Sequence, residues 1–180
     1  ALPAQCLDDV CLEISSRGKG DMREPFVELV LADGSRTSDF RYESFEIMDG
    51  LQTPDGLPGA YDAENQAQSL MITLTDRNSE VKLELIYGVL EACDCITRYA
   101  RLINGGEETV RVERLMSMQL DMSKGALKIT DFHGDWAREM NRNETILRSG
   151  KYINDTSVGF SSNRANPLFL WADTETTQDY

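Results

Sequence analysis

Alternation of apolar and polar residues with a period of two is the feature that most limits the folds open to this chain. It is clearest over residues 81–89, where the odd positions are apolar and the charged Lys82 and Glu84 lie between them. Such alternation places apolar side chains on one face of a strand and polar ones on the other. The best helical candidate, Asp135–Asn143, is short and has no continuous apolar face. The pattern therefore indicates a chain built from strands.

Turn signals separate the expected strands about every ten residues. The clearest are Ala32–Ser35, which predicts a hairpin, Asp76–Ser79 and Gly105–Glu108. Short strands with frequent turns are typical of an antiparallel sandwich or barrel. We therefore predict an all-β fold, and because no linker interrupts the chain we expect residues 1–180 to form a single domain. The expected strands cover residues 26–31, 41–48, 69–75, 81–89, 93–104, 109–122, 127–132 and 167–172.

Charge and length exclude several classes of partner. The chain has 180 residues, 41% of them hydrophobic, which is enough to bury a core without a disulfide or a metal. Its 31 acidic and 18 basic residues give a formal net charge of −13, which argues against nucleic acid and anionic membrane as partners. No apolar stretch approaches the ~20 residues that span a bilayer. No basic region followed by an apolar run opens the sequence, so we expect no signal peptide.

Cysteine and histidine spacing predicts no metal and no cofactor. The cysteines are Cys6, Cys11, Cys93 and Cys95, which form no C-x-x-C pair, and His133 is the single histidine. No phosphate-binding or dinucleotide-binding glycine motif is present. Two residues apart in an expected strand, Cys93 and Cys95 should share a face, and all four thiols are expected to be reduced and to pack as small hydrophobes.

Arg114 interrupts an otherwise apolar face of the expected strand 109–122. A bulge could turn the side chain to solvent, or its stem could lie on the strand while its head reaches water. Alternatively, a buried guanidinium could hold a carboxylate or a neighbouring domain, because a buried charge persists only when it is paired. The residues themselves leave both interpretations open.

Two charged clusters could carry chemistry. The stretch 132–139 combines His133, Trp136 and Arg138 with two carboxylates, as sugar sites do, but Trp136 could equally be an interface or core residue. The stretch 20–25 contains Asp21 and Arg23, which could form a surface ion-pair network. Acidic residues are so abundant that no catalytic pair with the ~5–9 Å separation of glycoside hydrolysis can be selected.

A series of motifs, in a constant order along the chain, resembles a known family. They are Gly18–Pro25, Asp33–Thr37, Asp39–Tyr42, Ile96–Arg98 with Asn104–Glu107, Glu113–Arg114, His133–Glu139 and Ser161–Pro167. Together they resemble the amino-terminal β-sandwich of the family 36 glycoside hydrolases, bacterial α-galactosidases of the melibiase type.

The resemblance implies a large twisted antiparallel β-sandwich, a supersandwich, truncated at both ends. A catalytic (β/α)₈ barrel would follow it, and the parent would hydrolyse terminal α-linked galactose from oligosaccharides with retention. Because both catalytic aspartates would belong to the barrel, no residue here is catalytic and the segment alone is expected to be inactive. The implied partners are the barrel, a galactoside bound by the parent, and further copies in a homo-oligomer. The implied location is the bacterial cytoplasm.

The resemblance also suggests where this domain contacts the rest of the parent. The candidates for domain-interface or sugar-proximal positions are Asp21, Arg23, Arg114, His133, Trp136, Arg138 and Asn166. Three positions depart from the family pattern: Met22 replaces an aromatic residue, and Asn163-Arg164 replaces His-Gln. These departures leave the substrate preference open, including between galactose and N-acetylgalactosamine.

Two other functions fit a sandwich of this composition. An autonomous carbohydrate-binding module would use Trp136 or Trp171 as a stacking platform, although the aromatic residues, 8% of the chain, are scattered. A structural or adhesive sandwich would suit the acidic surface. The ordered motifs favour the α-galactosidase domain over both.

Overall fold

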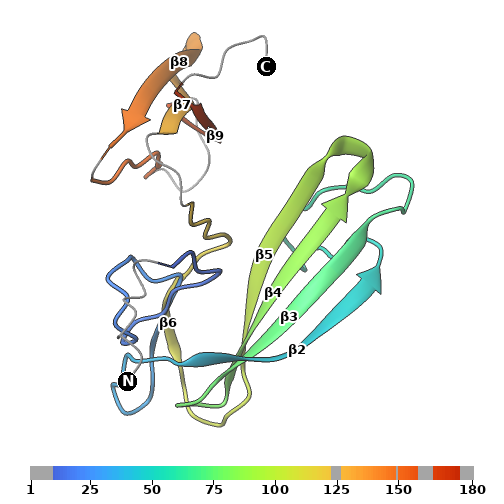
Figure 1. Cartoon of the computed structure of the whole chain (residues 1–180), viewed down its shortest axis with the longest axis vertical. Coiled ribbons are helices and arrows are strands. Elements are labelled where there is room, and N and C mark those ends of the chain that lie inside the picture. Colours follow the sequence, from blue (N-terminus) through green and yellow to red (C-terminus); the bar gives the residue numbers. More distant parts are fainter. Residues whose placement is uncertain (1–9, 123–126, 149, 158–163, 175–180) are drawn as a thin grey trace. The chain divides into compact units, whose positions relative to one another are not determined.

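Strands make up almost all the regular structure of the chain (Figure 1). The computed structural model describes residues 10–122, 127–148, 150–157 and 164–174. It divides into two compact units, Ala1–Met122 and Ser123–Tyr180. Within the described residues the one helical element is a short 3-10 turn, η2 (Glu91–Cys93). The predicted all-β, antiparallel class is therefore confirmed, and the interpretation of residues 1–180 as one domain stays a prediction.

The first unit is dominated by a long, twisted, four-stranded antiparallel sheet (Figure 1). Its strands follow one another in the order of the sequence, so each strand pairs with the next one along the chain. They are β2 (Phe40–Asp49), β3 (Gln68–Asp76), β4 (Val81–Leu90) and β5 (Cys95–Asn104). The alternation in residues 69–75 and 81–89 therefore predicted two of these strands with nearly correct bounds.

Two short strands, β1 (Val27–Val30) and β6 (Arg111–Leu115), pair antiparallel in a second sheet. The predicted hairpin at Ala32–Ser35 is wrong. A turn does form there, and the Leu31 N–H donates to the Ser35 carbonyl over 2.9 Å. However, the next strand begins only at Phe40 and joins the other sheet, because a turn signal specifies local geometry and not the partner of the strands beside it.

The core of this unit lies between the two sheets. Leu83 and Leu85, on alternating positions of β4, are at most 2% exposed, as the period-two pattern predicts. Burial of each such side chain contributes about 1.5–3 kcal/mol. The buried core cluster consists of Phe26, Val27, Leu29, Leu74, Val81, Leu83 and Leu85.

Arg98 on β5 fastens two irregular segments to the large sheet. Its guanidinium lies over the rings of Phe26 and Tyr87, at 5.6 and 5.1 Å from their centroids. It donates hydrogen bonds to the carbonyls of Gln119 (2.6 Å) and Glu13 (3.1 Å). Burial and the hydrogen bond to Glu13 raise the pKa of Tyr87. This cluster is a structural clamp on residues 13 and 119.

The second unit contains a three-stranded antiparallel sheet in the order β8-β7-β9. The strands are β7 (Leu127–Asp135), β8 (Arg138–Leu147) and β9 (Ala165–Asp173). Strands β7 and β9 contain the expected strands 127–132 and 167–172. β8 was not predicted, because its side chains are mostly polar and exposed and show no clear alternation.

The cysteines do not pack as predicted. Cys11, Cys93 and Cys95 are free but exposed, and Cys6 lies outside the described residues. Cys93 belongs to η2 and only Cys95 to a strand, so the two do not share a strand face. In the described part of the chain, no His, Cys, Asp and Glu side chains gather in threes where they could hold a metal ion. The described residues also contain no helix long and apolar enough to cross a membrane.

Candidate functional site

The tip of the β7–β8 hairpin has a fixed and unusual backbone. A Cβ on Gly134 would lie 2.3 Å from the carbonyl oxygen of Arg138, so only glycine fits there. Ala137 and Met140 have φ angles of 58° and 60°, in the left-handed region that non-glycine residues seldom adopt. Backbone strain of this kind is concentrated at binding and catalytic sites. The tip is therefore the first candidate for a functional element.

Trp136 projects from this tip with 86% of its surface exposed. Neighbouring side chains brace the loop, since the Trp136 N–H donates to Asp135 Oδ1 (2.8 Å) and the Ala137 N–H to Glu139 Oε1 (3.1 Å). The Arg138 side chain is also exposed, and its carbonyl accepts from Asn141 Nδ2 (2.8 Å). A large aromatic side chain on a braced loop is suited to anchoring a partner. The core interpretation of Trp136 is excluded.

A buried carboxylate, that of Asp131, links the strands of the hairpin to a neighbouring segment. Asp131 is 4% exposed and accepts hydrogen bonds from the Tyr152 hydroxyl (2.7 Å) and from Asn143 Nδ2 (2.9 Å). Its Oδ1 lies 3.7 Å from Nδ1 of His133, whose side chain is half-exposed. Burial alone would raise the pKa of Asp131, but the hydrogen bonds from Tyr152 and Asn143, together with the neighbouring His133, hold that pKa below its usual value. The ionised Asp131 thus ties β7, β8 and the segment around Tyr152 together.

Asn166 joins the same segment to the sheet. Its Nδ2 donates to the carbonyl of Phe132 (3.2 Å), and its own carbonyl accepts from Asn154 Nδ2 (2.9 Å). These bonds are structural. The neighbouring motif residue Asn163, where the sequence departs from the family pattern, lies outside the described residues.

Asp21 and Arg23 form an ion cluster in the first unit. Arg23 Nε lies 2.9 Å from Asp21 Oδ1, which also accepts the Arg23 backbone N–H over 3.0 Å. Arg23 also pairs with Asp121, and the Asp21 side chain is only 2% exposed. The cluster therefore fastens residues 21–23 to the segment around residue 121.

Arg114 is half-buried and neutralised within the first unit. Its Nη2 lies 2.7 Å from Glu24 Oε1, and its side chain is 32% exposed. The β1–β6 register shifts between Glu28 and Leu29, directly opposite Arg114, so a bulge is present as well. Both features that the sequence offered for Arg114 are found, and its carboxylate partner belongs to the same unit.

The seven candidates thus fall into two groups, one in each unit. Asp21, Arg23 and Arg114 lie in the first. The group in the second unit consists of His133, Trp136, Arg138 and Asn166.

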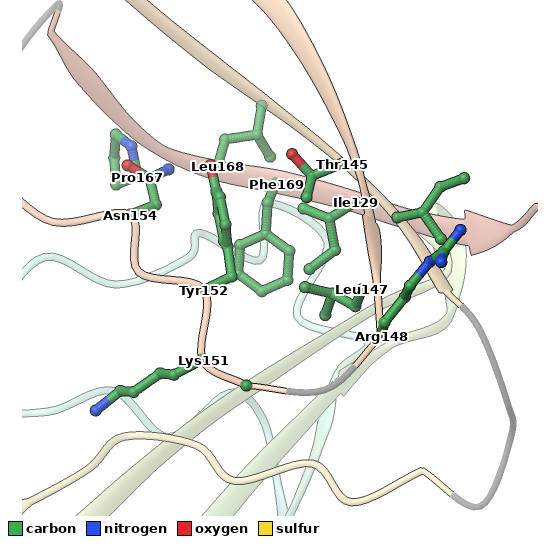
Figure 2. Close-up of a pocket in the computed structure, with 12 residues that line it drawn as sticks. Ile129, Thr145, Leu147, Arg148, Lys151, Tyr152, Asn154, Pro167, Leu168 and Phe169 are labelled. Carbon is green, nitrogen blue, oxygen red and sulfur yellow. The ribbon is translucent and has the colours of Figure 1, made fainter.

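A cavity in the second unit was not expected from the sequence. It has a volume of about 620 Å³ and an open mouth, and its lining is largely apolar, with Arg148 and Lys151 at opposite sides of it (Figure 2). Ile129, Leu147 and Phe169 contribute from the sheet and Tyr152 from the segment that crosses it. It could not be expected from the sequence because residues 141–158 are mostly polar, and Tyr152 and Asp131 give no separate signal.

Comparison with protein families gives one match that spans the chain. The profile described as "Glycosyl hydrolase family 36 N-terminal domain" matches residues 2–180. The chain is 34% identical over 172 residues to the bifunctional alpha-galactosidase/sucrose kinase AgaSK of Mediterraneibacter gnavus, covering 96% of this chain and 18% of that protein. It is 31% identical over 166 residues to alpha-galactosidase C of Emericella nidulans, covering 92% and 22% respectively.

Solved structures agree with the family match. The crystal structure of the GH36 alpha-galactosidase AgaA from Geobacillus stearothermophilus superposes with a TM-score of 0.90 at 30% identity. The match covers 94% of this chain and 24% of AgaA. The chain therefore spans only about a fifth of the length of the relatives that it matches.

Proposed function

Because the chain belongs to the glycosyl hydrolase family 36 N-terminal domain family, we propose that it is the non-catalytic amino-terminal part of an α-galactosidase. The parent would hydrolyse terminal α-linked galactose from oligosaccharides with retention, and this part would support the catalytic barrel. The observation that carries the proposal is the family match over residues 2–180. The names of the relatives, all α-galactosidases, supply the substrate class.

The contacts of the candidate site support a non-catalytic role. Retaining hydrolysis needs two carboxylates about 5–5.5 Å apart that can reach the substrate. Around the described hairpin, Asp131 is buried and hydrogen-bonded, while Asp135 and Glu139 accept backbone N–H groups. These carboxylates stabilise the hairpin, which supports the proposal that the catalytic pair belongs to the remainder of the parent.

The hairpin is the element best suited to contact that remainder. Trp136 and Arg138 are exposed and their backbone is braced, whereas Arg23 and Arg114 are already paired with carboxylates of their own unit. We therefore assign the interface role to Trp136, Arg138 and His133, and a structural role to Asp21, Arg23, Arg114 and Asn166.

The proposal extends to the setting of the parent. A homo-oligomer is supported by the large apolar side chains exposed on β2, such as Phe45 (60%) and Ile47 (64%). The motifs suggest that the parent is a cytoplasmic enzyme of a bacterium. The bacterial relative at 34% identity supports a bacterial source. The fungal relative at 31% identity shows that similar domains also occur in eukaryotes.

One observation favours a second candidate, a carbohydrate-binding module. Trp136 is exposed to 86%, as stacking platforms for sugars are. Titration of galactose or melibiose into the chain distinguishes the two. Saturable binding that Trp136→Ala abolishes would favour the module, and no binding is expected for the supporting domain.

The experiment that tests the proposal compares hydrolysis of a chromogenic α-galactoside by this chain and by the full-length product of the same gene. Activity in the long product alone is the expected result. Activity in the short chain would place the carboxylate pair within these 180 residues, and inactivity of both would remove the α-galactosidase assignment.

The interface role of Trp136 is tested in the long product. Trp136→Ala should lower its thermal stability or its turnover, because the interface loses its aromatic anchor. For a hot-spot residue the expected loss of interface free energy is about 1–3 kcal/mol. Trp136→Phe retains an aromatic ring and should therefore keep most of the stability and turnover of the wild type. If Trp136→Ala leaves both stability and turnover unchanged, the hairpin is not an interface.

A further inference from the structure

The turn between β4 and β5 carries two of the four cysteines of the chain. Cys93 is the last residue of η2 and Cys95 the first residue of β5, with Asp94 between them. Both thiols are free and both side chains are exposed. The turn lies at one end of the large sheet (Figure 1), and no residue of the buried core cluster belongs to it. Free cysteines are more often buried as small hydrophobes, so this exposed pair has no role in packing.

The backbone of the turn brings the two cysteines closer together than a strand would. Asp94 has φ 50° and ψ 39°, in the left-handed helical region. The Cα atoms on either side of an extended residue are about 6.6 Å apart, whereas those on either side of a helical residue of either hand are about 5.4 Å apart. The shorter separation is close to the about 5.5–6 Å that disulfides most often show, and the longer one is near their upper limit.

Local contacts hold the turn in this conformation. The Asp94 N–H donates to the Glu91 carbonyl over 3.3 Å, and Leu90 pairs with Cys95 across the hairpin. Sγ of Cys93 lies 3.7 Å from the carbonyl oxygen of Leu90, so this sulfur is directed back toward the residue that faces Cys95. Because both side chains are exposed, each thiol can change its χ1 rotamer without displacing a packed neighbour.

We propose that Cys93 and Cys95 form a redox-active dithiol, at which a low-molecular-weight disulfide such as oxidised glutathione closes a bridge across the turn. The thiolate of one cysteine attacks a sulfur of the small disulfide, and a mixed disulfide forms as the first glutathione leaves. The thiolate of the other cysteine then attacks the protein sulfur of the mixed disulfide and expels the second glutathione. Two protein thiols are oxidised to one disulfide, the small disulfide is reduced to two thiols, and these thiols take up the two protons.

The position of the pair favours closure of the bridge and also its reversal. Closure is intramolecular, so it is faster than attack by a second glutathione. Exposed disulfides have less negative reduction potentials than buried structural ones, so small thiols reopen them. The pair is therefore reduced in a reducing compartment and bridged when small disulfides accumulate. The proposal uses only residues 90–95 and does not rest on the proposed function.

The experiment equilibrates this chain and the full-length gene product with mixtures of oxidised and reduced glutathione. The remaining thiols are then alkylated, and a tryptic digest is analysed by mass spectrometry. Trypsin leaves Cys93 and Cys95 together in the peptide 83–98, and Cys6 and Cys11 in the peptide 1–17, so the two pairs are measured separately. In both native proteins the peptide 83–98 should lose two hydrogens. The equilibrium constant for this bridge should be at least about tenfold larger than in the same protein unfolded in urea, because the native turn holds the cysteines close together.

Serine variants identify the two steps. Cys93→Ser and Cys95→Ser should each retain a glutathione adduct on the remaining cysteine of the turn, because no second thiol expels it. Cys11→Ser is the matched control, since it also removes an exposed thiol, and should form the bridge like the wild type.

Phenylarsine oxide gives an independent measurement of the distance between the thiols. It condenses with two neighbouring thiols to a cyclic product and releases water, without a change of oxidation state. The peptide 83–98 should bind one arsenical in the wild type and in Cys11→Ser, and none in either serine variant of the turn.

Four results would overturn the proposal. They are thiols of the peptide 83–98 that stay free, two glutathione adducts on this peptide without a bridge, an equal equilibrium constant in the native and the unfolded protein, and a bridge in the short chain with unreactive thiols in the long product. The last would show that the rest of the parent covers the turn. None of these measurements depends on turnover, so an inactive long product that forms the bridge would refute the proposed α-galactosidase and retain this inference.

Discussion

Asp131 holds a buried negative charge that two neighbours stabilise, and this makes the stability of the second unit depend on pH. Because its pKa is lower in the folded chain than in the unfolded chain, where it is about 3.9, ionised Asp131 contributes stability above that pH. The contribution is lost as the pH falls through the folded pKa. Asp131→Asn should therefore destabilise the unit at pH 7, by about 1–3 kcal/mol, and progressively less below pH ~4.

Tryptophan fluorescence during urea unfolding measures this effect, because both tryptophans, Trp136 and Trp171, lie in the second unit. Asp135→Asn is the matched control, since the amide Oδ1 can still accept the Trp136 N–H and the side chain is 66% exposed, so the loss of its charge should change little. A difference between wild type and Asp131→Asn that is the same at pH 7 and pH 3 would show that the charge of Asp131 is not what stabilises the unit.

Single residues with a special role could be predicted where the residue type is unusual among its neighbours in the sequence. Trp136 and Arg114 stand out in the sequence as a lone tryptophan among charges and a charge on an apolar face, and the structure gives each a specific environment. Asp131 was not predictable, because it is one of 31 acidic residues and its partners, Asn143 and Tyr152, are distant in sequence. Its importance arises only when the fold brings them together.

At the scale of the element, two substitutions in the β7–β8 hairpin should have opposite effects. Gly134→Ala forces a Cβ against the Arg138 carbonyl and should destabilise the unit by about 1–3 kcal/mol. Ala137→Gly relieves a left-handed conformation that costs about 1–2 kcal/mol, less the entropy cost of glycine, and should be neutral or stabilising by up to ~1 kcal/mol. The same fluorescence measurement reports both, and a stabilising Gly134→Ala would disprove this geometry.

Whole strands were predictable where apolar and polar residues alternate in the sequence. β3 and β4 place apolar residues at alternate positions toward the core, and their bounds follow from the pattern. β8 is polar on both faces, so it gives no alternation. The predicted strand 109–122 shrinks to Arg111–Leu115, because beyond β6 the chain has no partner strand within the described residues. Pairing between strands that are distant in the sequence, such as β1 with β6, cannot be predicted from any local pattern of residues.

At the scale of the whole molecule, the order of the motifs identified the family while each motif alone was weak. The family match over residues 2–180 confirms that identification. The division near Met122 was not predictable, because no glycine- or proline-rich linker marks it in the sequence. The division into two compact units depends on contacts between residues that are distant in the sequence. The local composition of the chain does not predict these contacts.

The isolated chain should self-associate through the uncovered part of its large sheet. Tyr42, Phe45 and Ile47 on the edge strand β2 are 60–64% exposed, and burying them in a second copy is favourable. The net charge of −13 opposes association, so raising the salt concentration should screen this repulsion and strengthen it. Sedimentation velocity over a range of concentrations measures both effects.

Substitution of β2 side chains separates this association from other contacts. Phe45→Lys should weaken the self-association by about tenfold or more, because it places a charge in the apolar contact. Lys82→Ala, on the exposed side of β4 where the side chain pairs with Glu43 over 3.0 Å, should leave association unchanged. A wild-type chain that remains monomeric at high protein and high salt concentrations would show that the exposed β2 side chains do not drive assembly. Dimers that dissociate as salt rises would instead mean that ion pairs hold the copies together.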